Sequence, residues 1–231
     1  MKLITVNINP SEHFRNNKDK IPDEQMRKNR IIDFVEDNGQ YPDVIFFIEQ
    51  WYPVFEVVQQ ELKKSYTFYF PKGFNPSFYK EGIYPSHAGV VAAVRSELSV
   101  KKAEDGENYV TKTAKWLSLE IDTKVYLAVH YPQPGGQWDK FHEAVKKYVE
   151  SKKPVLIMGD FNTPKGCPVE IDGYADVLPP KEPTFVGGTK LDYIFVPQEL
   201  SFEAKAENMK NSMKPDSNQF FSDHAVTKVN I

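Results

Sequence analysis

Cysteine is almost absent from this sequence of 231 residues. Cys167 stands alone, so no intramolecular disulfide can form. A single cysteine suits a reducing compartment, and it also suits a secreted bacterial protein that uses few cysteines. Long apolar runs are absent as well: no stretch has the length of a membrane span, and the first ten residues lack the apolar core of a signal peptide. The sequence therefore predicts a cytoplasmic protein without a membrane span, while secretion after removal of a signal peptide stays open.

An excess of basic charge is also missing. The chain has 29 lysines and arginines against 32 acidic residues, which gives a net charge of −3. Dedicated nucleic-acid binders usually carry a basic excess, because phosphate contacts supply most of their affinity. The charge balance argues against tight, non-specific DNA binding. It remains compatible with an enzyme that holds its substrate locally through metal ions and a few lysines.

Internal repeats, low-complexity tracts and linker-like stretches are absent, so we expect one domain over residues 1–231 and a monomer. The composition, 40% hydrophobic and 26% charged, is ordinary for a globular protein with a sizeable core. Runs such as VIFFI and VLIMG do not alternate between apolar and polar residues, which indicates strands buried on both faces. Short apolar runs of this kind lie at residues 3–8, 43–48, 89–94, 115–121, 125–130, 154–161 and 191–196.

Amphipathic segments lie between these runs and predict surface helices. Residues 22–38 form one such segment, with Gly39 as a stop signal, and residues 54–64 and 138–150 resemble it. The apolar positions of the first segment are Met26, Ile31, Phe34 and Val35. We therefore expect a layered α/β protein in which helices cover a sheet. The remaining segments predict long loops at 71–88, 131–137, 162–189 and 208–222.

Polar residues stand at the ends of the predicted apolar strands. They are Asn7, Asn9, Glu49, His130, Asp160, Asn162, Asp192, Asp223 and His224. A buried carboxylate is costly unless it is paired or bound to a metal. A polar residue at the end of a single strand is ordinary and does not indicate a functional site. Six such ends, if they converge, predict an oxygen-rich pocket with two imidazoles.

Several familiar site motifs are missing, and their absence narrows the chemistry. The chain has no HxxxH or CxxC pair for zinc, no GxxxxGK[ST] loop, no GxSxG elbow and no GxGxxG fingerprint. Oxygen ligands without clustered cysteines favour a hard cation such as Mg²⁺, Mn²⁺ or Ca²⁺. Metal-assisted hydrolysis of a phosphate ester fits this inventory best.

An ordered set of motifs resembles the endonuclease/exonuclease/phosphatase superfamily, whose members include DNase I-like nucleases. The motifs are GDFN at 159–162, LDYIF at 191–195 and SDH at 222–224, preceded by Asn7 and Glu49 at strand ends. The resemblance extends over nearly the whole chain, with the motifs in the family's order. It implies a four-layered α/β/β/α sandwich, in which two mixed β-sheets pack face to face with helices outside. It also implies a Mg²⁺-dependent phosphoesterase, with Mn²⁺ as an alternative cation.

The resemblance implies a metal side of the site. Glu49 resembles the main Mg²⁺ ligand, with Asn7 and Asn9 beside it, and Asp223 resembles a further carboxylate near the metal. Asn9 departs from the family, which often has aspartate there. The structural alternative for Asn7 is a residue that only satisfies a loop.

The resemblance also implies the catalytic roles. Asp160 resembles the residue that orients or deprotonates the attacking water, and Asn162 resembles the one that holds a phosphate oxygen. His224 resembles the imidazole at the scissile phosphate, and Asp192 the carboxylate that fixes it, although Asp192 as a structural cap is the alternative. His130 resembles a second site residue that is histidine in some branches of the superfamily and tyrosine in others.

Three further residues are candidate substrate contacts. Lys115 stands about where many members carry a phosphate-binding arginine, and a solvated lysine is the alternative. Trp51 replaces an arginine that DNase I-like nucleases insert into the minor groove, which argues against a close DNase I equivalent. Glu81, in FYKEGIY, resembles the glutamate that orients the residue matched by His130, with an exposed loop residue as the alternative.

The substrate stays open between three hypotheses. The first is a nuclease, endo- or exonucleolytic, that acts on DNA or RNA. The second is a phosphodiesterase or phosphatase for a small-molecule or lipid phosphate. The third is a binding module that kept the fold and lost catalysis. The aromatic-rich segment 66–84 fits base stacking, lipid packing or a satellite core, and the satellite core is the favoured interpretation of the three.

Overall fold

Two six-stranded β-sheets form the centre of the molecule. The structure is a computed structural model that describes residues 1–8, 23–36, 41–49, 52–70, 90–105, 115–164, 168–214 and 216–231. In spatial order the first sheet contains β11 (Lys205–Met209), β12 (Val226–Asn230), β1 (Lys2–Asn7), β2 (Val44–Ile48), β4 (Val90–Arg95) and β3 (Tyr66–Tyr69). Strands β1 and β2 are parallel and the other neighbours are antiparallel, so the sheet is mixed.

The second sheet repeats this plan. In spatial order it contains β5 (Val100–Asp105), β6 (Lys115–Ile121), β7 (Lys124–His130), β8 (Leu156–Asp160), β10 (Asp192–Pro197) and β9 (Tyr174–Asp176). Its one parallel pair is β7 with β8, at the centre, and the other neighbours are antiparallel. Each sheet therefore has one central parallel pair, whose two strands end at the same rim.

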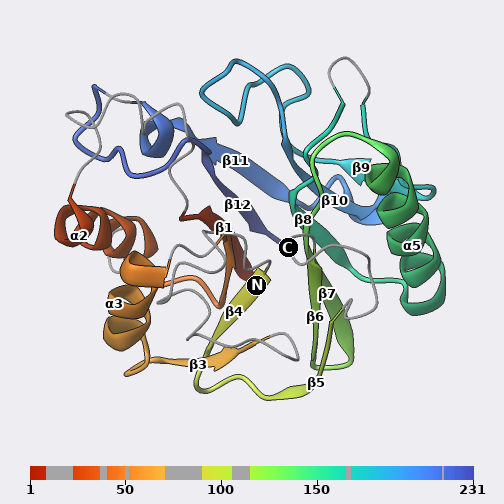
Figure 1. Cartoon of the computed structure of the whole chain (residues 1–231). Helices are drawn as coiled ribbons and strands as arrows, with labels where there is room; N and C mark the ends of the chain where they lie inside the picture. The colour runs from red at the N-terminus through yellow and green to blue at the C-terminus, as the bar shows by residue number, and fades with distance from the viewer. Residues whose placement is uncertain are drawn as a thin grey trace.

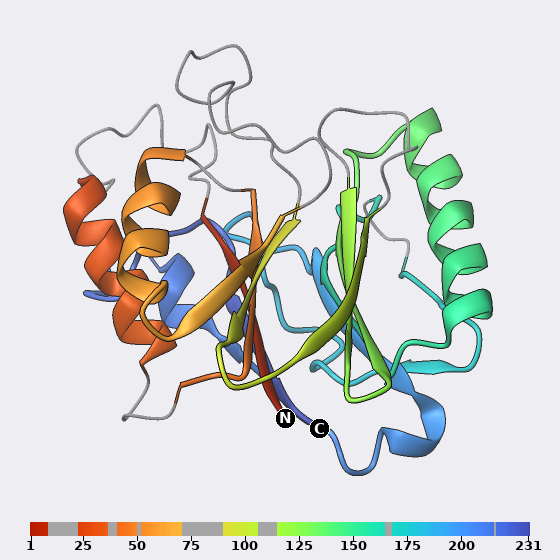
Figure 2. The same cartoon turned by 90° about the horizontal axis from the view of Figure 1, so that it is seen from below.

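Helices cover the outer faces of both sheets. Helices α2 (Glu24–Val35) and α3 (Tyr52–Leu62) lie outside the first sheet, and α5 (Gly136–Lys152) lies outside the second (Figures 1 and 2). Short 3₁₀ helices occupy Gln198–Leu200 and Lys210–Met213. Among the described helices, none is long and apolar enough to cross a membrane.

Three apolar cores hold these layers together. The central core lies between the sheets and includes Phe46 of β2, Ala128 of β7 and Ile194 of β10. The second core joins the outer face of the first sheet to α2 and α3, and the third joins the outer face of the second sheet to α5. The aromatic residues at the start of segment 66–84 belong to the second core, because Phe68 and Phe70 pack against Phe55. The predicted four-layered sandwich is confirmed.

Four of the strands that lie outside the predicted apolar runs are at the edges of the sheets. The patterning predicts no strand at β3, β5, β9 or β11, and each of these ends a sheet. An edge strand has only one neighbour, so it is often short and charged, as KAENM in β11 and the three-residue β9 are. Strand β9 lies inside the predicted loop 162–189, so that loop prediction is wrong in part.

The apolar face of α2 also differs from its prediction. Met26 was expected on the buried stripe, but it is 43% exposed, while Arg27 is fully buried. The buried positions are Arg27, Ile31, Phe34 and Val35, a spacing of four, three and one residues that lines one face of a helix. The helix begins at Glu24 because the Asp23 side chain accepts a hydrogen bond from the backbone N–H of Met26.

Candidate active site

The polar ends of strands from both sheets meet at one rim. In the second sheet, His130 pairs in register with Asp160, and Asp160 pairs with Asp192. In the first sheet, Asn7 ends β1 and Glu49 follows the parallel strand β2. The antiparallel strand β12 begins at this rim, just after His224. Strand direction therefore explains why residues so far apart in the sequence lie close together.

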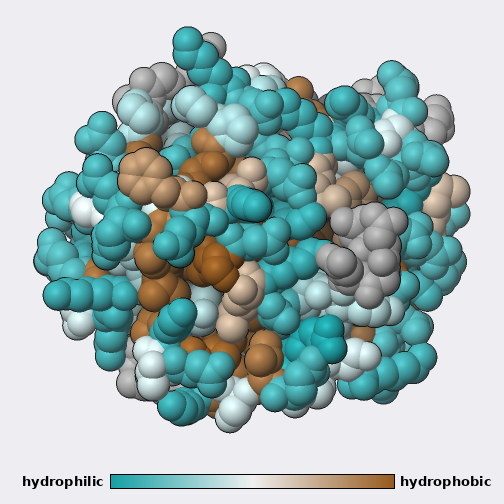
Figure 3. Space-filling model, turned by 180° about the vertical axis from the view of Figure 1, so that it is seen from behind, coloured by the Kyte–Doolittle hydropathy of each residue, from teal (hydrophilic) through white to brown (hydrophobic). Residues whose placement is uncertain are grey.

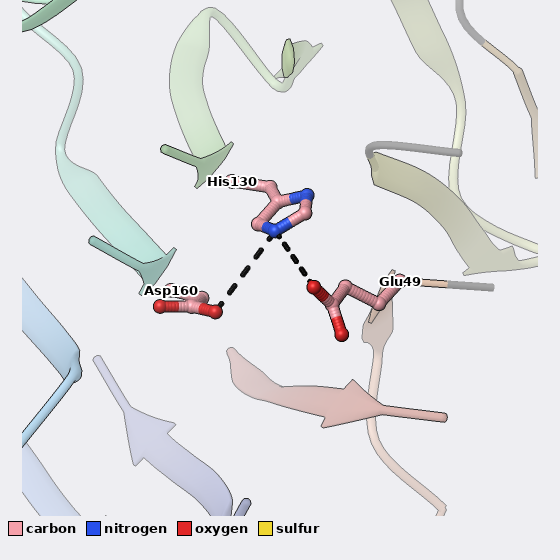
Figure 4. Close-up of side chains that lie close together, drawn as sticks. All are labelled: Glu49, His130 and Asp160. Carbon is pink, nitrogen blue, oxygen red and sulfur yellow. Dashed lines mark ion pairs between the residues drawn. The ribbon is translucent and has the colours of Figure 1, made fainter. Parts of the chain in front are cut away.

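One group of side chains joins the two sheets (Figure 4). Nε2 of His130 lies 3.1 Å from Oε1 of Glu49 and 4.0 Å from Oδ2 of Asp160. The ligand atoms of these three residues all lie within 4.8 Å of one another, so they could hold a metal ion. Asn7 is at the edge of this group, where its Nδ2 donates to Oε2 of Glu49 over 3.5 Å. Glu49 adopts the left-handed conformation, with φ of 50°.

Glu49 favours the protonated form of His130. Burial by itself would lower the pKa of His130, but the hydrogen bond and charge of Glu49, together with the charge of Asp160, raise it above its ordinary value. His130 is 3% exposed, and its Nδ1 forms no hydrogen bond within the described residues.

A second group centres on His224. Its Nδ1 lies 2.9 Å from Oδ2 of Asp192, and its Nε2 lies 3.9 Å from Oδ2 of Asp160. Burial opposes protonation, yet the charges of Asp192 and Asp160 hold the pKa of His224 well above its ordinary value. These charges therefore favour the cationic imidazole, whose Nε2 lies on the side of Asp160.

Asp160 belongs to both groups. The side chain is 1% exposed, and burial raises its pKa to about 7, against the opposing charge of His224. The backbone N–H of Asn162 donates to Oδ1 over 2.8 Å. Oδ2 is thus the oxygen that faces both imidazoles, and it is suited to accept a proton near neutral pH.

Asn162 is held in one orientation by its neighbours. Its backbone is left-handed, with φ of 42°, and its Nδ2 donates to the carbonyl of Tyr131 over 2.9 Å and to Oδ2 of Asp160 over 3.3 Å. Its Oδ1 accepts from Nε2 of Gln133 over 2.9 Å. Sequence patterning did not single out Gln133; its place in a loop that follows a polar strand end is the signal that could have found it.

Other contacts fix the strands that carry the site. The hydroxyl of Thr184 accepts hydrogen bonds from the backbone N–H groups of Leu191 and Asp192, both 2.9 Å long. Phe185 forms an isolated β-bridge with His224, and the two rings lie 5.2 Å apart. Neither Thr184 nor Phe185 was predicted, because both lie in a long segment without an apolar run.

Some predicted residues fall elsewhere. Asp223 is 3% exposed beside His224 but belongs to neither group of candidate ligands, and its backbone carbonyl accepts from the N–H of Val186. The predictions for Asn9, Trp51 and Glu81 lie outside the described residues. The backbone of Lys115 pairs with His130 in the sheet, while its side chain lies outside the description.

A separate cavity lies at the opposite rim of the sheets. It has a volume of about 460 Å³, and its lining includes Met1, Tyr126, Val155, Leu200 and Ile231. On the face seen from behind, Figure 3 shows apolar side chains gathered among hydrophilic ones. The clusters of carboxylates and imidazoles in the described chain lie at the other rim, away from this cavity.

Comparison with known proteins places this geometry in a family. The model of the "Endonuclease/Exonuclease/phosphatase family" matches residues 16–224. No curated protein sequence matches the chain. A similar solved structure is D. rerio TDP2 complexed with single strand DNA product, with 14% identity, a TM-score of 0.68 and coverage of 100% of this chain and 99% of that chain.

Two other solved structures are similar to the same degree. The human Nocturnin catalytic domain with bound sulfate anion has 14% identity and a TM-score of 0.67, and the match covers 99% of this chain and 92% of that chain. An endonuclease/exonuclease/phosphatase from Bacteroides vulgatus has 16% identity and a TM-score of 0.67, covering 100% of this chain and 98% of that chain. At these identities the likeness establishes the fold.

Proposed function

The chain belongs to the endonuclease/exonuclease/phosphatase family, whose members hydrolyse phosphoester bonds, and we propose that it is a Mg²⁺-dependent phosphodiesterase. The observation that carries this proposal is the position of Asp160. Its Oδ2 lies 4.0 Å from Nε2 of His130 and 3.9 Å from Nε2 of His224. A proton acceptor between two imidazoles supports in-line attack of a water on phosphorus.

The residues present fit a hard divalent cation. Glu49 offers carboxylate oxygens and Asn7 offers an amide oxygen, the donors that Mg²⁺ prefers, while Nε2 of His130 also suits Mn²⁺. When bound, the cation would supply positive charge against the phosphoryl oxygens. We assign Glu49 as the main ligand, with Asn7 beside it and Asp223 as a more distant carboxylate; Asn9 is a further candidate.

The side chains of the protein then accept the proton of the attacking water and stabilise the charge that grows on the phosphate. Oδ2 of Asp160 accepts the proton of the attacking water, because its raised pKa makes it a base suited to neutral pH. As the water oxygen bonds to phosphorus, the opposite P–O bond breaks, and the leaving oxygen takes a proton from solvent. His224, held by Asp192, donates a hydrogen bond to a phosphoryl oxygen as negative charge grows there. Asn162 keeps its shorter hydrogen bond to the carbonyl of Tyr131. Its Nδ2 gives up the longer hydrogen bond to Asp160 and donates to a phosphoryl oxygen instead.

We further propose a nucleic-acid strand as the substrate. Support comes from D. rerio TDP2, whose solved structure contains a single strand DNA product. The bound sulfate of the Nocturnin structure supports a site for a tetrahedral anion, which a small-molecule phosphate would also satisfy. Lys115, Trp51 and Glu81 remain candidate substrate contacts. We expect a cytoplasmic, monomeric protein with a single domain.

The test is hydrolysis of bis-p-nitrophenyl phosphate with Mg²⁺, with Mn²⁺ and with EDTA. We expect activity with either metal and none with EDTA, and a loss of about 10²-fold or more in His224→Ala. His142→Ala is the matched control, because it removes another histidine that belongs to neither group of candidate ligands. His142 lies on α5, and its Nδ1 bonds to the hydroxyl of Tyr131. Undiminished activity in EDTA or in His224→Ala contradicts the proposal. Single-stranded DNA, RNA, sphingomyelin and inositol phosphates, compared as substrates, then separate nucleic acid from small or lipid phosphates.

A further inference from the structure

Arg27 occupies a position that should belong to an apolar residue. It lies on the buried face of α2, four residues before Ile31, and its side chain is fully buried. A leucine or isoleucine at this position would complete the apolar stripe that packs on the first sheet. The arginine is therefore not explained by the packing of the helix.

Two further effects oppose an arginine here. Removing a guanidinium from water costs free energy that its partners must offset. Arg27 also lies in the first turn of α2, where the helix dipole disfavours a positive charge. A residue that breaks local rules in this way often serves a functional site.

The hydrogen bonds of Arg27 reach two separate segments. Nη2 donates to the carbonyl of Ile8, and Nε donates to the carbonyl of Phe221 over 3.1 Å. Neither carbonyl belongs to α2. The planar guanidinium presents its donors in a fixed geometry, so the two bonds together set the distance between the segments.

Each of these segments leads directly into the candidate site. Ile8 follows Asn7, and its backbone N–H donates to the carbonyl of Ile48, the residue before Glu49. Phe221 precedes Ser222, whose hydroxyl accepts from the backbone N–H of His224. Through these two backbone carbonyls, Arg27 thus connects the carboxylate side of the site to the imidazole side.

We propose that Arg27 is a positioning residue that fixes the separation between the Asn7–Glu49 side of the site and His224. The inference rests on the proposed function. Misplacement of a reacting group by about 1 Å can reduce a rate about 10²-fold while binding is retained. Loss of Arg27 should therefore lower kcat while KM and metal binding change little, because each half of the site keeps its own residues.

Arg27→Met tests the proposal, because methionine fills the stripe without a buried charge. Arg30→Met is the matched control: Arg30 lies three residues later on α2 and donates to the carbonyl of Phe220, one residue farther from His224. With bis-p-nitrophenyl phosphate we expect kcat to fall about 10- to 100-fold in Arg27→Met and less than about threefold in Arg30→Met. KM and the rise in Tm caused by Mn²⁺ should stay near wild type in both.

Two results overturn the proposal: a kcat within about threefold of wild type in Arg27→Met, or equal losses in both variants. If Arg27→Met does not fold, Arg27→Lys replaces it, because one ammonium does not bridge both carbonyls as the guanidinium does; a folded Arg27→Lys with wild-type kcat is equally contrary. An inactive wild-type protein refutes the proposed function instead. Amide hydrogen exchange over residues 221–226 then decides: Arg27→Met should exchange faster there than Arg30→Met, and equal exchange overturns the positioning role.

Discussion

The Asp160→Asn substitution removes a buried charge from the candidate site while keeping the shape of the side chain. An asparagine Oδ1 still accepts the hydrogen bond that the backbone N–H of Asn162 now donates to Oδ1 of Asp160. The amide does not accept a proton from water at any ordinary pH. We therefore expect the variant to be more stable than wild type without metal and to have lost its activity. Such a trade-off between stability and activity is expected of a buried catalytic charge.

The size and sign of the stability change follow from the pKa of Asp160. Burial raises that pKa from its ordinary 3.8 to about 7. The folded protein then binds a proton that the unfolded chain has released, so the contribution of Asp160 to stability is fully present below about pH 4 and is lost as the pH rises through about 7. A shift of about three units corresponds to about 4 kcal/mol.

The variant also loses a carboxylate beside two imidazoles, which offsets part of this gain. We expect Asp160→Asn to exceed wild type by about 1–3 kcal/mol at about pH 8, with a difference that vanishes near pH 4. Urea unfolding in EDTA at pH values across this range measures the difference. Hydrolysis of bis-p-nitrophenyl phosphate, measured in parallel with Mg²⁺, should fall about 10²-fold or more.

Asp176→Asn is the matched control for this prediction. Asp176 is a partly buried carboxylate in β9 that already has a cation, because Nζ of Lys190 donates to its Oδ2. Burial raises the pKa of Asp176 too, but removing this carboxylate leaves Lys190 without its charged partner, so the same substitution should stabilise the protein less than Asp160→Asn does. The reasoning is refuted if Asp160→Asn is less stable than wild type at about pH 8, or if the difference between them does not change with pH.

Two further predictions concern His224 and the strand that carries Asp160. Asp192→Asn removes the charge that contributes most to the raised pKa of His224, so the pKa of His224 should fall. The decline of kcat at alkaline pH should then begin at a lower pH than in wild type. An unchanged pH profile contradicts this role. Gly159→Ala places a Cβ 2.1 Å from the carbonyl oxygen of Val129, at a φ of 137°, and should lower the free energy of unfolding by more than about 3 kcal/mol or prevent folding. Gly173→Ala, with a φ of 78° and open space around its Cβ, should cost about 1 kcal/mol, so urea unfolding that ranks the two variants equally would count against the steric explanation.

The central strands could be predicted from sequence because burial on two faces leaves a strong pattern. VIFFI in β2 and LIMGD in β8 are fully buried, and their apolar runs indicate them directly. Among the edge strands, β11 is only partly buried, and both β5 and β11 carry charges, so their sequences resemble loops. Sequence patterning thus predicts the central strands of each sheet but not the number of strands at its edges.

The candidate site divides along a similar line. Polar residues at the ends of apolar strands could be predicted, and the structure brings Glu49, His130, Asp160, Asp192 and His224 together. Their partners could not, because Gln133 and Thr184 act through hydrogen bonds that loop conformation alone provides. A glutamine or threonine in a loop has no pattern that distinguishes these roles from solvent exposure.

Arg27 shows why neither apolar periodicity nor polar residues at strand ends reveals every residue that supports the site. Two of its bonds run to backbone carbonyls, and because a carbonyl is present at every residue, the sequence does not mark these two acceptors. Helical periodicity alone did not separate Arg27 from the exposed Met26 beside it, because the hydrophobic side chain was taken for the buried one. The signal lay in position: residues 27, 31, 34 and 35 share one helix face, and an arginine on that face needs buried acceptors. Buried cations on apolar helix faces are therefore places to seek the supports of an active site before its ligands are known.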